Sequence, residues 1–306
     1  GRKCIYAKVV IDATGDGDIY SKTGAPFDDR RIPELDVGRT ALVWRMGGVD
    51  FEAYQEWVKK NPELNGRFLK GMAEVAGYPT MFFTDSRNDV VWVNNWLPDK
   101  CCIDINDQTE SEYLVRGTIR KLIKYISRTL PFAFRDAYLY DIAPQLGARS
   151  GRRLIGEHVM TMLDFATQRK FDDVIAWHSL VSNVVDGAPV EIPYSCILPQ
   201  KVENLLCPGR HLSADMRAIN TLYLIPQCIG TGQAAGVAAA VAVKDGTTMH
   251  TVDIKRVQRI LAYEQDVPLP RMENTDPELV RELEECKYGT MTPTAIEIRK
   301  KAGLDW

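Results

Sequence analysis

The sequence predicts a chain of the α/β class, α+β overall, because a strand followed by a glycine-containing turn occurs in two separate places. Residues 8–13 (KVVIDA) and 202–207 (VENLLC) are apolar runs typical of buried parallel strands. After the second turn, residues 230–244 form a predicted helix of unusually small residues that ends near Gly246. Helices and β-rich runs alternate between these segments, which indicates a mixed inserted domain.

Composition excludes several classes of protein. The 306 residues are 45% hydrophobic and 26% charged, which is typical of one or two folded domains. A formal net charge of -3 gives no general electrostatic reason to bind nucleic acid or an anionic membrane. No apolar run reaches the roughly 20 residues that span a bilayer, and we find no signal peptide. Seven cysteines without a C-x-x-C pair indicate a cytoplasmic protein with no metal site.

The first strand runs into an acidic, glycine-rich turn at residues 14–18 (TGDGD), and a short helix follows at residues 19–23. After residue 31 the pattern becomes mixed. Residues 40–46 and 89–96 are β-rich runs, whereas residues 51–60 form a predicted helix that ends before a proline.

A long amphipathic helix is predicted at residues 110–129. Thr109 to Glu112 has the form of a capping box, and the following apolar residues fall on one helical stripe. A strand at residues 138–142 and a small helix at residues 171–176 follow.

These elements predict three parts of the chain. The first is a half-domain formed by residues 1–30 and 192–262, to which residues 138–160 cross back. The second is an inserted mixed α+β substrate domain at residues 31–191. The third is a helical C-terminal tail at residues 263–306.

Two segments are candidate ligand sites. Residues 13–18 follow a strand, and open α/β sheets bind ligands at the carboxyl ends of their strands. A solvent-exposed acidic turn that caps a helix is the alternative. Residues 230–240 could direct the free N–H groups of a helix N-terminus at an electron-rich ligand. The alternative there is a buried helix packed tightly on the sheet.

Five segments occur in an order that resembles one family. They are IDATGDGD (11–18), LGARSGRRLIGEHVMT (146–161), IPYSCILP (192–199), NLLCPGRHLSA (204–214) and GTGQAAGVAAAVAV (230–243). Together they resemble the FAD-dependent oxidoreductase family related to fumarate-reductase-type flavoproteins. The resemblance implies FAD as the cofactor and a partial FAD-binding Rossmann-like domain of the glutathione-reductase type. The FAD contacts that it implies are Ala13, Thr14, Gly15, Asp18, Gly209, Arg210, Thr231, Gly232 and Gln233.

The family also carries an early strand–GxGxxG–helix unit that holds the FAD pyrophosphate, and this sequence contains none. We therefore expect the chain alone to bind FAD weakly or not at all. An N-terminal FAD-binding polypeptide or subunit is the partner that this expectation implies, and a homo-oligomer is compatible with the sequence. Ser150-Gly151 stands where the family usually shows Glu-Ser, which leaves the substrate open.

Arg152 and His211 are the candidate catalytic residues. With Arg149 and Arg153, Arg152 could clamp a substrate carboxylate through its planar guanidinium or stabilise negative charge on the reduced flavin. A domain-joining ion pair or a helix C-terminal contact is the alternative. His211 lies just past a predicted flavin-facing turn, and imidazole titrates near neutrality, so it could act as an acid or a base. A histidine that is hydrogen-bonded within a loop is the alternative.

These features predict an FAD-dependent oxidoreductase or dehydrogenase, or its C-terminal part, that transfers hydride between a small organic substrate and flavin N5. A non-catalytic flavoprotein-like scaffold or regulatory subunit that needs a partner chain is the alternative. A nicotinamide or another nucleotide in the same site is a third. The aromatic residues of the insert could pack in a core or bind an apolar ring. They are Trp44, Phe82, Phe83, Trp92 and Trp96.

Overall fold

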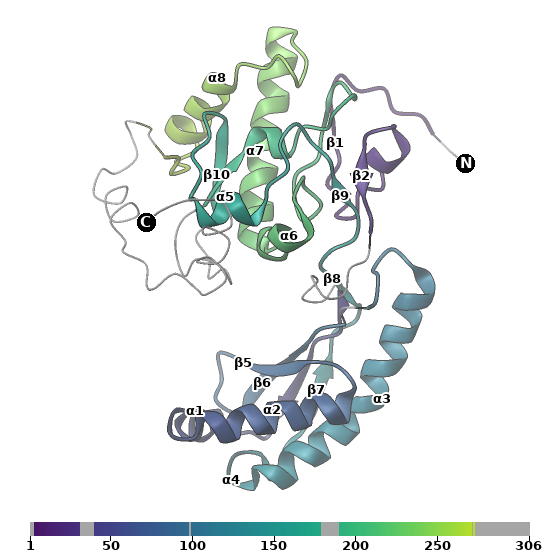
Figure 1. Cartoon of the computed structure of the whole chain (residues 1–306), viewed down its shortest axis with the longest axis vertical. Helices are drawn as coiled ribbons and strands as arrows, with labels where there is room; N and C mark the ends of the chain where they lie inside the picture. The colour runs from purple at the N-terminus through teal and green to yellow at the C-terminus, as the bar shows by residue number, and fades with distance from the viewer. Residues whose placement is uncertain (1–2, 31–39, 98, 179–189, 271, 273–306) are drawn as a thin grey trace. The chain divides into compact units, whose positions relative to one another are not determined.

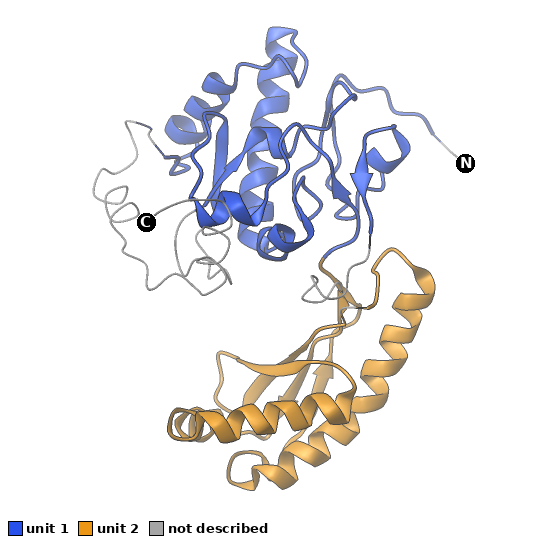
Figure 2. Cartoon of the chain, in the orientation of Figure 1, with its two compact units in different colours: residues 1–35, 150–306 blue, residues 36–149 orange. Residues whose placement is uncertain are grey.

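The computed structural model describes residues 3–30, 40–97, 99–178, 190–270 and 272 (Figure 1). The chain forms two compact units, of which unit 1 comprises Gly1–Leu35 and Ser150–Trp306 and unit 2 comprises Asp36–Arg149 (Figure 2). Unit 2 is shorter than the insert expected at residues 31–191, because the strands and helices that follow Arg149 pack within unit 1. Most of the expected helical tail lies outside the described residues.

Unit 2 is built on an antiparallel sheet whose strand order is β5–β6–β4–β7. Its strands are β4 (Trp44–Gly47), β5 (Thr80–Thr84), β6 (Val90–Asn95) and β7 (Tyr138–Ile142), and a separate pair joins β3 (Thr40–Ala41) to β8 (Gly147–Ala148). The expected strands at residues 40–46, 89–96 and 138–142 are confirmed. β-branched and aromatic side chains favour the extended backbone in these runs.

Helices α1 to α4 share one hydrophobic core with this sheet (Figure 1). They are α1 (Phe51–Lys60), α2 (Pro62–Ala76), α3 (Ile105–Thr129) and α4 (Pro131–Phe134). Helix α3 begins before the expected residue 110, because the Asp104 carboxylate accepts hydrogen bonds from the N–H groups of Asn106 and Asp107. The expected capping box is therefore wrong, and the Thr109 hydroxyl instead donates to the Ile105 carbonyl inside the helix.

The sheet divides the aromatic residues of unit 2 between its two faces. Trp44 and Phe82 are buried in the core, whereas Phe83 and Trp92 are exposed on the opposite face. This division follows from the alternation of side chains along each strand. On the exposed face, the Arg45 guanidinium lies 4.9 Å from the centre of the Trp92 ring.

The described residues of unit 1 contain three two-stranded pairs. β1 (Val10–Ile11) and β12 (Leu205–Leu206) lie within the two runs expected as strands, and they pair with each other in parallel. The antiparallel pairs are β2 (Phe27–Asp28) with β9 (Arg153–Leu154), and β10 (Val174–His178) with β11 (Val190–Pro193). The small helix expected at residues 171–176 is wrong, because the β-branched Val174 and Ile175 belong to a strand that has a partner.

β1 is less buried than the sequence predicts. Val10 and Ile11 are 38% and 36% exposed, whereas Leu205 and Leu206 of β12 are buried. Among the described residues, β12 is the only strand that pairs with β1. The second edge of β1 therefore has no strand partner in the described part of the chain, and the Val10 and Ile11 side chains are partly exposed.

Helices complete unit 1. They are α5 (Met162–Ala166), α6 (Met216–Leu222), α7 (Ile225–Asp245) and α8 (Ile254–Arg259), which continues into the π-helix η4 (Ile260–Glu264). Helix α7 packs on β10 and begins before the expected residue 230, since a proline fits its first turn (Figure 1). In the described part of the chain, no single helix is long and apolar enough to cross a membrane. Helices α6 and α7 together meet the length and composition, but the pair is bent by 89°.

Candidate functional site

Two turns lie at the same end of the parallel pair β1–β12. Residues 12–18 follow β1, residues 207–211 follow β12, and parallel strands end at the same edge of a sheet. His211 Nε2 lies 3.0 Å from the carbonyl oxygen of Asp12 and 2.9 Å from that of Pro208. Because both neighbours are acceptors, Nε2 carries the proton and donates. The imidazole thus joins the two turns.

A buried carboxylate shapes the first turn. Asp12 accepts hydrogen bonds from the N–H and hydroxyl groups of Thr14, at 3.1 and 2.6 Å, and from the N–H groups of Ile19 and Tyr20, at 3.1 and 2.9 Å. Burial alone raises the pKa of Asp12, but these hydrogen bonds outweigh it and hold the pKa below its ordinary value. The ionised carboxylate fixes the path of the backbone from β1 into the short helix η1 (Tyr20–Lys22).

The first turn requires glycine at position 15. Gly15 has a φ of +85°, in the left-handed region that glycine favours. A Cβ atom at this position would lie 2.5 Å from Cζ of Arg210. The Arg210 guanidinium therefore packs directly on the turn, and its Nη2 forms an ion pair with Asp16 Oδ2 at 3.0 Å.

Arg152 contacts the same turn. Its Nη1 donates to the carbonyl oxygen of Asp16 at 2.8 Å and to the carboxylate of Asp18 at 3.1 Å. Arg153 is instead buried on β9, where it pairs with Asp28 at 3.1 Å. Only one of these two adjacent arginines therefore reaches the turn, and it is the one preferred from the sequence.

Arg149, the third arginine of the expected cluster, belongs to unit 2. There its guanidinium donates to the Asn94 side chain at 2.8 Å and lies 5.5 Å from the centre of the Trp96 ring. The three arginines therefore have three different environments.

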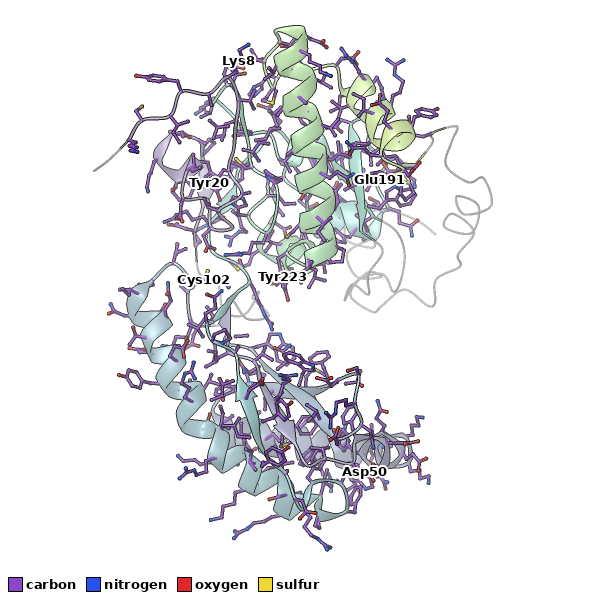
Figure 3. All side chains as sticks on the ribbon, turned by 180° about the vertical axis from the view of Figure 1, so that it is seen from behind. Lys8, Tyr20, Asp50, Cys102, Glu191 and Tyr223 are labelled. Atoms are coloured by element: carbon purple, nitrogen blue, oxygen red, sulfur yellow. The ribbon has the colours of Figure 1, made fainter. Side chains whose placement is uncertain are left out.

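The surroundings of His211 favour its structural alternative. The side chain is fully buried and stacks on the Tyr20 ring, with 5.3 Å between the centroids (Tyr20 is labelled in Figure 3). Burial lowers the pKa of His211 below its ordinary value, although the nearby Asp12 carboxylate opposes this effect. A neutral imidazole that donates to two carbonyl groups supports the turns from within.

Helix α7 meets the second turn through Thr231. The Thr231 hydroxyl accepts a hydrogen bond from the Gly209 N–H at 3.2 Å and donates to the Gln227 carbonyl at 2.8 Å. Thr231 lies inside α7, so its own N–H group is used within the helix. The expectation that a helix begins at residue 230 and directs free N–H groups at a ligand is wrong.

Gly232 and Gln233 line a different surface. They border a groove of about 350 Å³ between α7 and η4, where Gln233 Nε2 donates to Gln265 Oε1 at 2.8 Å. Successive residues of an α-helix point about 100° apart, so Gly232 cannot share the direction of Thr231. Of the expected contacts on α7, only Thr231 therefore bonds to a turn.

Three residues of this site have roles that the sequence did not indicate: Asp12, Asp16 and Tyr20. The sequence could have indicated the role of Asp12, because a carboxylate inside an apolar strand needs hydrogen-bond partners if it is buried. The sequence gives no such indication of the ion pair of Asp16 with Arg210, since the two residues are 194 positions apart in the chain.

Comparison with known proteins identifies one family. A family model described as FAD dependent oxidoreductase matches residues 1–261, a stretch that includes both turns and α7. No curated protein and no solved structure matches the chain significantly. The family match implies FAD as the cofactor. Because the match covers most of the chain, the protein belongs to the FAD-dependent oxidoreductase family.

Proposed function

We propose that the chain is a subunit or C-terminal part of an FAD-dependent oxidoreductase that transfers hydride between a small organic substrate and flavin N5. The observation that carries this proposal is the junction of the two turns through His211 and through the Arg210–Asp16 ion pair. When bound, FAD supplies the hydride acceptor or donor for a substrate C–H bond. The protein positions the reactants and sets the charge around them.

The residues of the two turns fit a flavin nucleotide. Ala13 and Thr14 are exposed, and Gly15 offers its backbone without a side chain in the way. Two buried nitrogens, Arg210 Nε and His211 Nδ1, have no hydrogen-bond partner among the described residues. Such orphaned groups are typical of a site that a ligand or water completes. The residues that we assign to FAD are Ala13, Thr14, Gly15, Asp18, Gly209 and Arg210.

Arg152 and His211 receive different roles in this proposal. Both hydrogen bonds that Arg152 forms with described residues use Nη1, which leaves Nε and Nη2 for a substrate carboxylate. We assign Arg152 to that contact. His211 acts as a positioning residue, because its Nε2 proton is held by two carbonyl groups and its side chain is buried.

An N-terminal FAD-binding polypeptide or subunit completes the site in this proposal, in a Rossmann-like arrangement with a parallel strand beside β1. The open edge of β1 and the exposure of Val10 and Ile11 support this part of the proposal. The exposed side of α7 supports it as well, since Ile225 and Ile229 are apolar side chains that a covering helix would bury.

Flavin absorbance and melting temperature test the proposal. The purified 306-residue chain is titrated with FAD, with and without a polypeptide that carries the strand–GxGxxG–helix unit of the family. We expect weak or no binding by the chain alone, and visible flavin bands with a higher melting temperature when the polypeptide is present.

Arg210→Lys should weaken the flavin absorbance and the rise in melting temperature, because lysine lacks the planar guanidinium that packs on Gly15. Arg217→Lys, an exposed position on α6, is the matched control.

Hydride transfer has its own readout. In the loaded complex, small organic substrates with an oxidisable C–H bond should bleach the flavin absorbance under anaerobic conditions. If folded protein gave no flavin signal in either mixture, the non-catalytic scaffold would be the better description.

A further inference from the structure

Strand β7 forms an open edge of the sheet in unit 2. It pairs with β4 on one side, and no strand of the described residues pairs with its other side. Tyr138, Leu139 and Tyr140 are 54%, 41% and 46% exposed. An unpaired strand that exposes apolar side chains is a template on which another chain can form hydrogen bonds.

A groove of about 560 Å³ lies between β7 and α3. Leu139 and Ile142 face the helices, because their partners on β4 are buried in the core on that side of the sheet. Ile119 and Ile123 of α3 continue the same apolar floor. The hydrophobic core of unit 2 therefore reaches the surface along this groove.

Cationic side chains form the wall of the groove. Arg116, Arg120 and Lys124 line it at a spacing of four residues on α3, so they lie on one face of the helix. Arg116 pairs with Glu112 at 2.6 Å. Arg120 and Lys124 are exposed and form no ion pair within the described part of the chain. The groove thus combines an apolar floor with a positive charge that nothing described neutralises.

We propose that unit 2 binds an acidic, extended segment of a partner protein, which adds to the open edge of β7 as a further strand. Backbone N–H and C=O groups of β7 pair with the segment, and alternate apolar side chains of the segment cover Leu139 and Ile142. Its carboxylates reach Arg120 and Lys124.

Charge decides between this occupant and a second copy of the chain. Pairing of two β7 edges would bring two cationic α3 helices together, and like charges across an interface are unfavourable. An acidic segment instead neutralises Arg120 and Lys124. The proposal uses residues of unit 2 alone and is therefore independent of the flavin site in unit 1.

Fluorescence anisotropy with the full 306-residue chain tests the proposal. The probes are two labelled peptides, each about as long as an ordinary strand, that alternate valine with glutamate or valine with lysine. We expect the glutamate peptide to bind and the lysine peptide not to bind. The double variant Arg120→Glu, Lys124→Glu should weaken binding by about tenfold or more. Lys121→Glu, which is exposed on the same helix but outside the groove, should leave binding within about twofold.

Hydrogen exchange supplies an independent readout of strand addition. Amide exchange at residues 138–142 should slow when the glutamate peptide is added to the wild-type chain, and should not slow in the double variant. Equal binding of both peptides, an equal loss with Lys121→Glu, or unchanged exchange along β7 would each overturn the proposal. Laurate, a fatty acid with a carboxylate and an apolar chain, is a third probe. If laurate bound and neither peptide did, the proposal would be overturned and the groove would be a fatty-acid site.

Discussion

His211 donates a hydrogen bond to the backbone carbonyl of Asp12 across 3.0 Å, and the two residues are 199 positions apart in the chain. Strands β1 and β12, which precede these residues, contribute only two residues each to their parallel pair. A short pair has few backbone hydrogen bonds of its own. The side-chain bond therefore contributes substantially to the alignment of the two turns, and the site is sensitive to any change in the imidazole.

Acidification should destabilise unit 1 through His211. Burial lowers the folded-state pKa of His211 below the ordinary value of 6.5. Between these two pKa values the unfolded state therefore binds more protons than the folded state. Stability from the neutral imidazole is complete above pH 6.5 and is lost as the pH falls towards the folded-state pKa. His211→Gln keeps a donor near Nε2 but does not titrate. Urea unfolding at about pH 7.5 and about pH 5.5 measures how much of the free energy of unfolding is lost on acidification. This loss should be smaller for the variant than for the wild-type chain, and equal losses would contradict the prediction.

Gly15→Ala should destabilise the chain more than Gly24→Ala. Both glycines are in the left-handed region, with φ of +85° and +86°, so alanine strains the backbone by about 1 to 2 kcal/mol at either position. The space around them differs, because a Cβ on Gly15 meets the Arg210 guanidinium, whereas nothing lies within 4 Å of one on Gly24. We expect a further loss of up to about 1 kcal/mol for Gly15→Ala, because the flexible Arg210 guanidinium must move away from its ion pair with Asp16. Denaturant midpoints of the two variants measure the difference, and equal midpoints would count against the contact.

The parallel strands show how far the sequence predicts this fold. β-branched and leucine side chains mark residues 8–13 and 202–207 as strands, and the turns after them lie where open α/β sheets place their ligands. The exposure of Val10 and Ile11 could not be predicted in the same way. Burial depends on how many neighbours a strand has, and neighbours come from distant parts of the chain.

Segments that are compatible with two structures account for the wrong predictions. Residues 171–176 are a short run whose periodicity fits a helix or a strand, and only the partner β11 decides for the strand. The glycines from Gly230 onward indicated the start of a helix, but α7 already begins at Ile225. That shift places Gln233 within the helix, on a groove, rather than at a helix N-terminus beside the turns.

Asp12→Asn should destabilise the chain by about 2 to 3 kcal/mol, because a buried carboxylate that accepts four hydrogen bonds loses one acceptor oxygen. The amide NH₂ group of asparagine would face an N–H donor of Ile19 or Thr14. The folded-state pKa of Asp12 is lowered, so its contribution is present above the ordinary value of 3.8 and is lost as the pH falls through the folded-state pKa. The variant should lose that part of the acid dependence.

The control for this change is Asp18→Asn. Asp18 is exposed and forms one ion pair with Arg152, so its replacement should cost less than about 1 kcal/mol. Urea unfolding of both variants at neutral pH provides the comparison. A similar loss in the two variants would show that the four hydrogen bonds of Asp12 are not the source of its effect.

Arg152→Gln should reduce activity on substrates that carry a carboxylate and leave neutral substrates little changed. The available Nε and Nη2 groups of Arg152 suit a carboxylate, and loss of a charge-assisted pair costs about 1.5 to 3 kcal/mol, which is about a tenfold to hundredfold rise in KM. Stability should change little, because the Asp18 partner is exposed. Steady-state kinetics of the complete flavoenzyme, with a carboxylate substrate and its amide, measure the difference. If both substrates lost activity equally, Arg152 would act by supporting the turn at Asp16 and Asp18, since that contact serves every substrate alike.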